Sequence, residues 1–173
     1  MSSEISAALK GNFKLAASMF PSGVAIVTSG HGSVVHGITV SAFSSLSLDP
    51  PQVLVCVARW SKLNQLVLAS NSFAVNILAA DQAALSEVFA KPGRDPVTTF
   101  TEIEIPHSIG VGGSPIIDGT AGYFDCSVVM ACESGDHSVF FGDVLAAHAS
   151  ETKSPLVYFN RRYHDINNAA QEM

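Results

Sequence analysis

Small hydroxyl-bearing residues interrupt two apolar stretches in the first third of the chain. The segment GITVSAFSSLSLDPP (residues 37–51) holds four serines, one threonine and a single charge, and it separates GVAIVTS (23–29) from QVLVCVA (52–58). Small side chains let a flat ligand approach the backbone, and hydroxyls with neighbouring N–H groups can bond its polar edge. A strand bend, in which Ser41 to Ser47 bond the backbone of their own turn, explains the same residues. The residues alone leave both interpretations open.

A second polar cluster follows the apolar stretch at 52–58. Arg59, Ser61, Lys62 and Asn64 place cationic and hydroxyl donors where a predicted strand gives way to a predicted helix. The N-terminus of a helix with such donors is a natural site for an anion such as phosphate. Ordinary capping of the helix by Ser61 is the alternative explanation.

No local catalytic motif occurs in the sequence. GxSxG, HExxH, the P-loop pattern and a GxGxxG after a strand are all absent, and none of the six histidines is paired at ligand spacing. His137 belongs to GDH (135–137), which is first of all a hairpin turn, and it acts on a ligand only if that turn folds over one. An enzyme without a nucleophile or a metal often takes its chemistry from a cofactor.

The cysteines do not form a metal site. Cys126 and Cys132 lie on one strand-like run, and six residues of strand separate them by about 20 Å, which is too far to share an ion. The three cysteines cannot all pair within the chain, so we expect structural thiols, no metal and a cytoplasmic protein.

Composition excludes two classes of partner. Hydrophobic residues make up 47% and charged residues 14%, yet the longest unbroken apolar run, Val53 to Ala58, is far short of the roughly 20 residues that span a bilayer. The net charge of −6, with nine dispersed lysines and arginines, argues against a nucleic-acid interface. We therefore expect a homo-oligomer that buries the apolar excess, built from one domain of 173 residues.

Periodicity predicts a mainly β protein with a few helices. An amphipathic helix runs from Ile5 to Phe20, weakened at Gly11, and the connections at 30–33 and 134–137 are too short for parallel crossovers. We therefore expect an antiparallel barrel or sandwich. The other predicted elements are strands at 24–29, 34–42, 52–58, 72–78, 122–133, 138–149 and 155–159, a short helix around Leu63 to Val67, a helix capped by Asp81 and broken at Pro92-Gly93, a loop-rich stretch at 91–120, and a polar tail.

The order of these segments resembles the short-chain flavin reductase family, the reductase partners of two-component flavin-dependent monooxygenases. Each matching piece is short, but together they follow the family's order over roughly residues 13 to 163. The pieces are PSGVAIVTS, GITVSAFSSLSLDPPQVLVCV, the turn at 61–64, SFAVNIL, EVFA, GDHSVFFGDV and PLVYFNRRY.

The resemblance implies a fold and an activity. The fold is a six-stranded antiparallel split β-barrel of Greek-key type, the FMN-binding split barrel, in a single flavin reductase-like domain over 1–173. The family works as a homodimer with flavin near the subunit interface. The implied activity is NAD(P)H:flavin oxidoreduction, in which a hydride passes from NADH or NADPH to FMN or FAD and the reduced flavin serves a partner oxygenase.

The resemblance also implies site residues, none of which is catalytic in the strict sense. Backbone N–H groups around Ser41 to Ser45 are expected to stabilise negative charge on the reduced flavin. The flavin ring is expected against Thr39, Val40, Ser41, Ala42 and Ser45, its phosphate at Ser61, Lys62 and Asn64 with Arg59 nearby, its cover at Phe89, Ala90 and Lys91, and the nicotinamide at His137 and Tyr163.

The chain departs from the family at two places. Many members carry a threonine in the phosphate turn where this chain has Leu63 or Asn64, and the basic NRRYHD segment offers Arg161 or Arg162 to the dinucleotide phosphates instead. Two alternative functions stay open: a reductase of another acceptor on the same barrel, such as ferric iron or a corrinoid, and a flavin-binding module without catalysis.

Overall fold

The computed structural model describes residues 2–91, 93, 100 and 104–166. In chain order the elements are α1 (Ser2–Ser18), β1 (Ser22–Gly23), β2 (Ala25–His31), β3 (Val34–Val40), β4 (Phe43–Leu48), β5 (Pro51–Ala58), α2 (Lys62–Ser70), β6 (Ser72–Ile77), η1 (Ala80–Gln82), α3 (Ala83–Ala90), β7 (His107–Ile109), β8 (Pro115–Ile117), β9 (Gly122–Ser134), β10 (His137–Ala149), β11 (Leu156–Phe159) and β12 (Arg162–Asp165).

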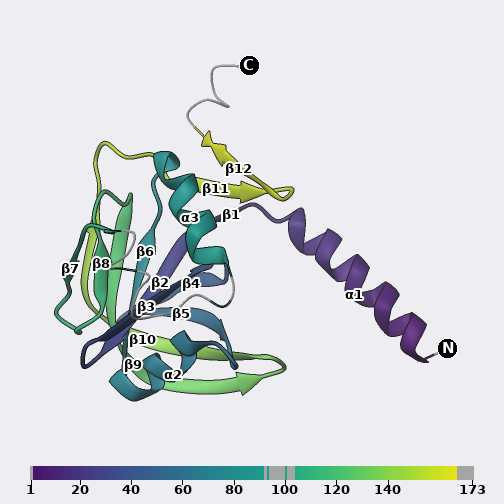
Figure 1. Ribbon diagram of the computed structural model, residues 1–173, viewed down its shortest axis with the longest axis horizontal. Coiled ribbons are helices and arrows are strands. Elements are labelled where there is room, and N and C mark those ends of the chain that lie inside the picture. The colour runs from purple at the N-terminus through teal and green to yellow at the C-terminus, as the bar shows by residue number, and fades with distance from the viewer. Residues whose placement is uncertain (1, 92, 94–99, 101–103, 167–173) are drawn as a thin grey trace.

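The largest element is an antiparallel sheet of seven strands in the order β3-β2-β6-β9-β10-β5-β4. Two small sheets, β1-β11-β12 and β7-β8, are attached to it (Figure 1). The predicted antiparallel, mainly β architecture is therefore confirmed. The predicted six-stranded barrel needs correction, because the main sheet has seven strands and its pairings within the described chain end at β3 and β4 without closing.

Strand β2 is buried on both faces, which explains its uninterrupted apolar run. Because side chains alternate along a strand, Ala25 and Val27 face one core and Ile26 faces the other. The first core, inside the curved sheet, contains Ala25, Val27, Val40, Val53, Val55, Val57, Leu63, Val67, Phe73, Val75, Cys126 and Phe140. The second core, between the sheet and α3 and β11, contains Val24, Ile26, Leu78, Phe89, Phe100, Ile105, Ile117 and Leu156.

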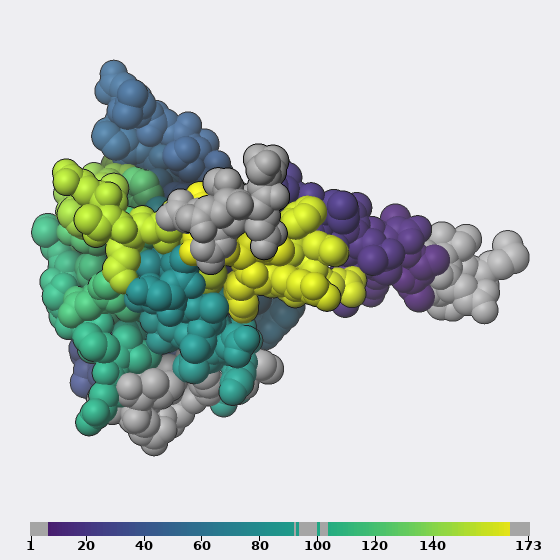
Figure 2. All heavy atoms as spheres, turned by 90° about the horizontal axis from the view of Figure 1, so that it is seen from above, coloured from purple at the N-terminus to yellow at the C-terminus, as the bar shows by residue number. Residues whose placement is uncertain are grey.

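Helix α1 runs through Gly11 without a break and projects from the body of the molecule (Figures 1 and 2). Its predicted amphipathic face does not pack on this chain's core, since Phe13 is 71% exposed and Phe20, just beyond the helix, is 76% exposed. No helix in the described part of the chain is long and apolar enough to cross a membrane.

Several predicted boundaries were wrong. Asp81 does not cap a helix: it lies in the 3-10 turn η1, and its Oδ2 pairs with Nζ of Lys153 at 2.6 Å, which lowers the pKa of Asp81. The loop-rich stretch contains the two strands β7 and β8, and the tail forms β12. The expected break at Pro92 lies outside the described residues.

The two long predicted strands, β9 and β10, are confirmed as a hairpin. Its two-residue turn has Gly135 at φ 57°, with Asp136 following and Ser134 opposite His137. Positive φ at the first turn position alone is typical of a type II′ turn, which suits the twist of antiparallel strands. His137 is therefore the first residue of β10, at the tip of the hairpin.

Candidate functional site

The segment after β2 forms strand β3, a turn at Ser41 and Ala42, and a previously unexpected edge strand, β4. Strand β4 has a register shift between Ser45 and Ser47 where it pairs with β5. Bulges and polar side chains at an edge strand hinder pairing with other chains, which gives the serines of β4 a structural explanation.

The Ser41–Ala42 turn presents its backbone to the surface. The Phe43 N–H donates to the Ser41 carbonyl at 3.1 Å, and the Cys56 N–H donates to the Ala42 carbonyl at 3.0 Å. Neither the Ser41 N–H nor the Ala42 N–H donates a hydrogen bond within the described part of the chain. Both residues are exposed, whereas the Val40 side chain is packed into the first core.

Thr39 and Tyr163 both contact Ser86 of helix α3. The Thr39 hydroxyl donates to the Ser86 carbonyl at 2.7 Å, and Oγ of Ser86 lies 2.9 Å from Oη of Tyr163. The structure thus brings one residue predicted for the flavin wall close to one predicted for the nicotinamide side. Ser86, which is buried, joins them and was not expected from the sequence.

Ser61 begins α2 as its N-cap. Its Oγ accepts a hydrogen bond from the Asn64 N–H at 3.1 Å, so the capping interpretation is confirmed. The Asn64 side chain is 4% exposed, and its Nδ2 has no hydrogen-bond partner among the described residues. Arg59 is turned to the hairpin, where its Nη2 lies 2.8 Å from Oε2 of Glu133.

Three of the predicted residues, Ser61, Lys62 and Lys91, border one pocket of about 300 Å³, which we name the cationic pocket. Its other lining residues are His36, Ile38, Trp60 and Gly93. His36 was missed, although strand alternation offered a signal: it lies on the same face of β3 as Ile38. Two lysines and a hydroxyl in one cavity suit a phosphate group.

The residues at the end of α3 differ in burial. Phe89 is 1% exposed and lies so close to Gly37 that a Cβ there would be 3.0 Å from Cε1 of Phe89. The Phe89 side chain therefore serves the second core, whereas Ala90 and Lys91 are exposed at the helix end. This packing fixes where α3 ends and so places Lys91 at the cationic pocket.

His137 lies at the hairpin tip with two close neighbours. Its Nδ1 is 2.6 Å from Oδ1 of Asp136, a contact that lowers the pKa of Asp136, and its ring centroid is 6.3 Å from that of Trp60. No hydrogen bond or ring contact joins His137 to Tyr163 within the described chain. The predicted nicotinamide-side residues therefore belong to two separate neighbourhoods.

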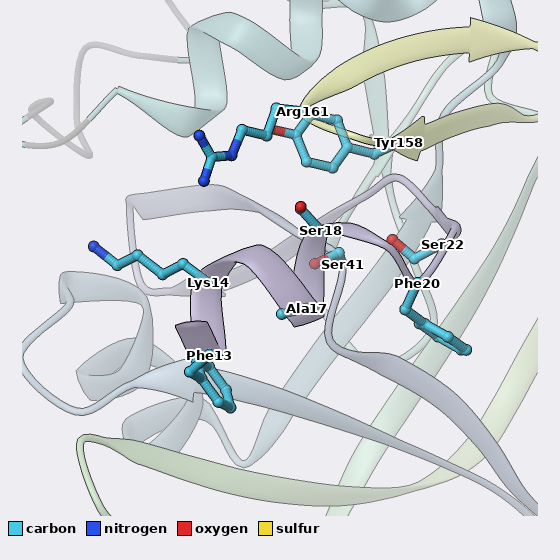
Figure 3. A pocket seen from close by; sticks show the side chains of 9 residues that line it. All are labelled: Phe13, Lys14, Ala17, Ser18, Phe20, Ser22, Ser41, Tyr158 and Arg161. Atoms are coloured by element: carbon cyan, nitrogen blue, oxygen red, sulfur yellow. The ribbon is translucent and has the colours of Figure 1, made fainter. Parts of the chain in front are cut away.

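A larger groove of about 820 Å³ lies between α1 and β11. Ser41 lines it, together with Lys14, Tyr158 and Arg161, and in Figure 3 the Lys14 and Arg161 side chains extend to the same side. Arg162 lies instead on β12, exposed and opposite Phe159. Because exposed Phe13 and Phe20 form much of its wall, this groove is an apolar surface rather than a finished polar site.

The cysteines are free thiols without a metal cluster in the described part of the chain. Burial raises the pKa of Cys126 to about 12, with Asp125 and Asp143 adding to the effect. Burial also raises the pKa of Cys56, and Cys132 adds to it. Cys56 and Cys132 both face Val139 from opposite sides, so their Cα atoms lie about 10 Å apart, beyond the reach of a disulfide.

These features define an antiparallel β protein with a pocket bordered by two lysines and, elsewhere on its surface, an exposed turn at Ser41 and Ala42. A model of the flavin reductase like domain matches residues 17–167. The chain therefore belongs to the flavin reductase-like family, and the resemblance inferred from its sequence is confirmed.

Relatives of this family cover most of the chain. The reductase component of 4-nitrophenol 4-monooxygenase/4-nitrocatechol 2-monooxygenase from Rhodococcus opacus is 36% identical over 154 residues, covering 89% of this chain and 80% of that protein. FMN reductase (NADH) RutF from Stutzerimonas stutzeri is 32% identical over 162 residues, covering 93% and 91%. The solved NADH:FAD oxidoreductase SgcE6 of Streptomyces globisporus, in complex with NAD and FAD fragments, superposes with a TM-score of 0.82 at 31% identity, covering 90% and 91%.

Proposed function

We propose that this chain is an NAD(P)H-dependent flavin reductase that passes a hydride to FMN or FAD and delivers the reduced flavin to a partner monooxygenase. Family membership over residues 17–167 is the observation that carries the proposal. The Rhodococcus relative, named as the reductase component of a monooxygenase, supports the partner.

The cationic pocket is the proposed phosphate site. Lys62 and Lys91 supply positive charge and Ser61 supplies a hydroxyl at the start of α2, which together match the charge and hydrogen-bonding demand of a flavin phosphate. The Ser41–Ala42 turn is the proposed wall for the ring, because its two N–H groups and small side chains leave the backbone open to a flat ligand. Phe89 acts through packing.

The flavin, when bound, supplies the hydride acceptor, and NADH or NADPH supplies the hydride. The chain's own residues orient the two rings at contact distance. This positioning supplies a large share of the rate acceleration. The Ser41 and Ala42 N–H groups are placed to stabilise negative charge on the acceptor. No side chain is required to give or take a proton for the hydride step itself.

We propose a homodimer, in the cytoplasm, formed by one domain with a core over about residues 13–163 and built on the family's split barrel. Exposed apolar side chains along α1 and in the groove beneath it, including Leu9, Phe13 and Phe20, favour burial against a second copy. Free thiols suit a reducing compartment.

Steady-state oxidation of NADH and NADPH with FMN, FAD and riboflavin as acceptors tests the proposal. We expect nicotinamide oxidation that depends on added flavin, with one flavin reduced per nicotinamide under anaerobic conditions. Flavin binding without oxidation would instead identify a flavin-binding module. Faster reduction of ferric iron or a corrinoid, with flavin inactive as acceptor, would move the chain to a different reductase class.

A further inference from the structure

Trp60, the only tryptophan of the chain, stands between two cavities. Its side chain is 71% exposed, and it lines both the cationic pocket and a second groove of about 590 Å³. We name this second cavity the hairpin groove, since it lies between α2 and the tip of the β9–β10 hairpin. Its lining residues are Arg59, Trp60, Asn64, Gln65, Leu68, Glu133, Gly135 and Asp136.

The indole of Trp60 is held in place at this boundary. The His137 ring meets it edge-on, with ring centroids 6.3 Å apart and an interplanar angle of 66°. Residues 58 to 61 form a tight connection in which the Ser61 N–H donates to the Ala58 carbonyl at 3.0 Å and the Arg59 N–H donates to the Asp136 carbonyl at 3.1 Å. An exposed aromatic ring with a fixed position is a platform on which a base can stack.

The two cavities differ in chemistry in a way that matches the two parts of a dinucleotide. The cationic pocket has Lys62 and Lys91, which suit phosphate. The hairpin groove has an aromatic ring and the carboxylates of Glu133 and Asp136, which pair with Arg59 and His137 and keep further lone pairs for ribose hydroxyls or an exocyclic amine.

Asn64 adds an independent observation. It is 4% exposed and lines the hairpin groove, and its Nδ2 has no hydrogen-bond partner among the described residues. A buried amide without a partner costs free energy that a ligand acceptor removes. Because Nδ2 itself is shielded from solvent, a ligand in the groove can accept from it only after the Asn64 side chain turns toward the groove.

From this arrangement we propose that the hairpin groove binds the adenosine half of a dinucleotide, with the base stacked on Trp60 and the diphosphate lying toward the cationic pocket. The proposal rests on the proposed function in so far as the dinucleotide is a reductase substrate. The adenosine half occurs in FAD and in NADH alike. A groove continuous with the flavin phosphate site at Trp60 favours FAD, and it would make this chain prefer FAD to FMN.

Two variants of the full chain, Trp60→Ala and Trp60→Phe, distinguish FAD from NADH as the dinucleotide that the groove binds. Isothermal titration should show FAD binding weakened about tenfold more than FMN binding in Trp60→Ala, on the scale of one lost base–aromatic stack, since Trp60 also borders the cationic pocket. Trp60→Phe should restore most of the FAD affinity, because a phenyl ring still stacks. If Trp60→Ala instead raises the KM for NADH, measured with FMN as acceptor, the groove binds the adenosine half of NADH.

Titration of 5′-AMP into the wild-type protein gives a test without any flavin. Because Trp60 is the only tryptophan, stacking should quench the intrinsic fluorescence, and the AMP should compete with FAD but not with riboflavin. Quenching by AMP in a protein that binds no flavin would support the groove while refuting the reductase. The inference is overturned if AMP leaves the fluorescence unchanged and Trp60→Ala alters neither the FAD-to-FMN affinity ratio nor the KM for NADH.

Discussion

Nδ1 of His137 lies 2.6 Å from Oδ1 of Asp136, its neighbour in the turn of the β9–β10 hairpin. The contact lowers the pKa of Asp136, so the carboxylate keeps its charge to a more acidic pH than a free aspartate does. When Nδ1–H donates to this carboxylate, Nε2 of the neutral ring is left as an acceptor. The hairpin thereby sets the orientation of an imidazole beside Trp60.

His137→Asn should impair the nicotinamide half of the reaction and spare the flavin half. FMN binding and thermal stability should stay nearly unchanged, because His137 begins β10 at the hairpin tip and does not line the cationic pocket. The KM for NADH should rise and flavin reduction should slow, since a donor ring misplaced by about 1 Å costs on the order of a hundredfold. Stopped-flow bleaching of the flavin measures both effects. Unaltered kinetics would return His137 to a purely structural role in the hairpin.

Lys62→Ala should weaken FMN about tenfold and leave riboflavin unchanged, because only FMN carries the phosphate that the cationic pocket is proposed to hold. Arg59→Ala should have a smaller effect on FMN, since its guanidinium is already paired with Glu133. Lys153→Ala is the control, as that lysine pairs with Asp81 outside the pocket. Equal losses for FMN and riboflavin in Lys62→Ala would mean that the turn shapes the protein without recognising phosphate.

Ser61→Ala should lower the free energy of unfolding by about 1 kcal/mol, because α2 loses the side chain that accepts the Asn64 N–H. Ser61→Asn should restore most of that loss, since Asn is an equally good cap. Urea unfolding monitored by circular dichroism gives both values. If Ser61→Ala keeps wild-type stability and only weakens FMN, the hydroxyl serves the ligand and the cap contributes nothing.

The strands could be predicted because burial leaves a direct mark on sequence. Ala25 to Val27 are all apolar because both faces of β2 are covered, and the 122–149 hairpin follows from its turn residues. Strand β4 was missed because an edge strand needs no buried face, so its serines resemble a loop. Asp81 was misplaced because its partner, Lys153, lies 72 residues away in sequence.

The sequence indicated individual site residues but not how they lie relative to one another. Local patterns indicated Ser61 as a cap and Lys62 as a donor, since both depend on the start of one helix. The sequence could not show that Ser86 joins Thr39 to Tyr163, because this contact depends on how α3 packs against β3 and β12. Nor could it show that Arg59 pairs with Glu133 across the hairpin.

Thiol reactivity should separate the cysteines. With a pKa of about 12, the Cys126 thiol is only about one part in ten thousand thiolate at pH 8, and thiolate is the reactive form. Exposed Cys132 should therefore react first with Ellman's reagent, and Cys126 only after unfolding. The Cys132→Ser variant should lose the fast phase. A fast phase that survives in that variant would contradict the assignment.

Helix α1 should be held by a second copy of the chain. A helix of 17 residues is marginal in water by itself, and the side chains of Leu9 and Phe13 share one face that is largely exposed in a single copy. Phe13→Asp should therefore convert a dimer to single chains without unfolding the sheet. Asn12→Asp, which adds the same charge about 100° around the helix, should leave the dimer intact.

Sedimentation velocity at micromolar concentration decides this prediction. The wild type and Asn12→Asp should sediment at twice the mass of the 173-residue chain, and Phe13→Asp at once that mass. Since Ser41 lines the groove beneath α1, the monomeric variant should also bind flavin more weakly. A wild type that sediments as a single chain would refute the dimer, and with it any flavin site completed by a second subunit.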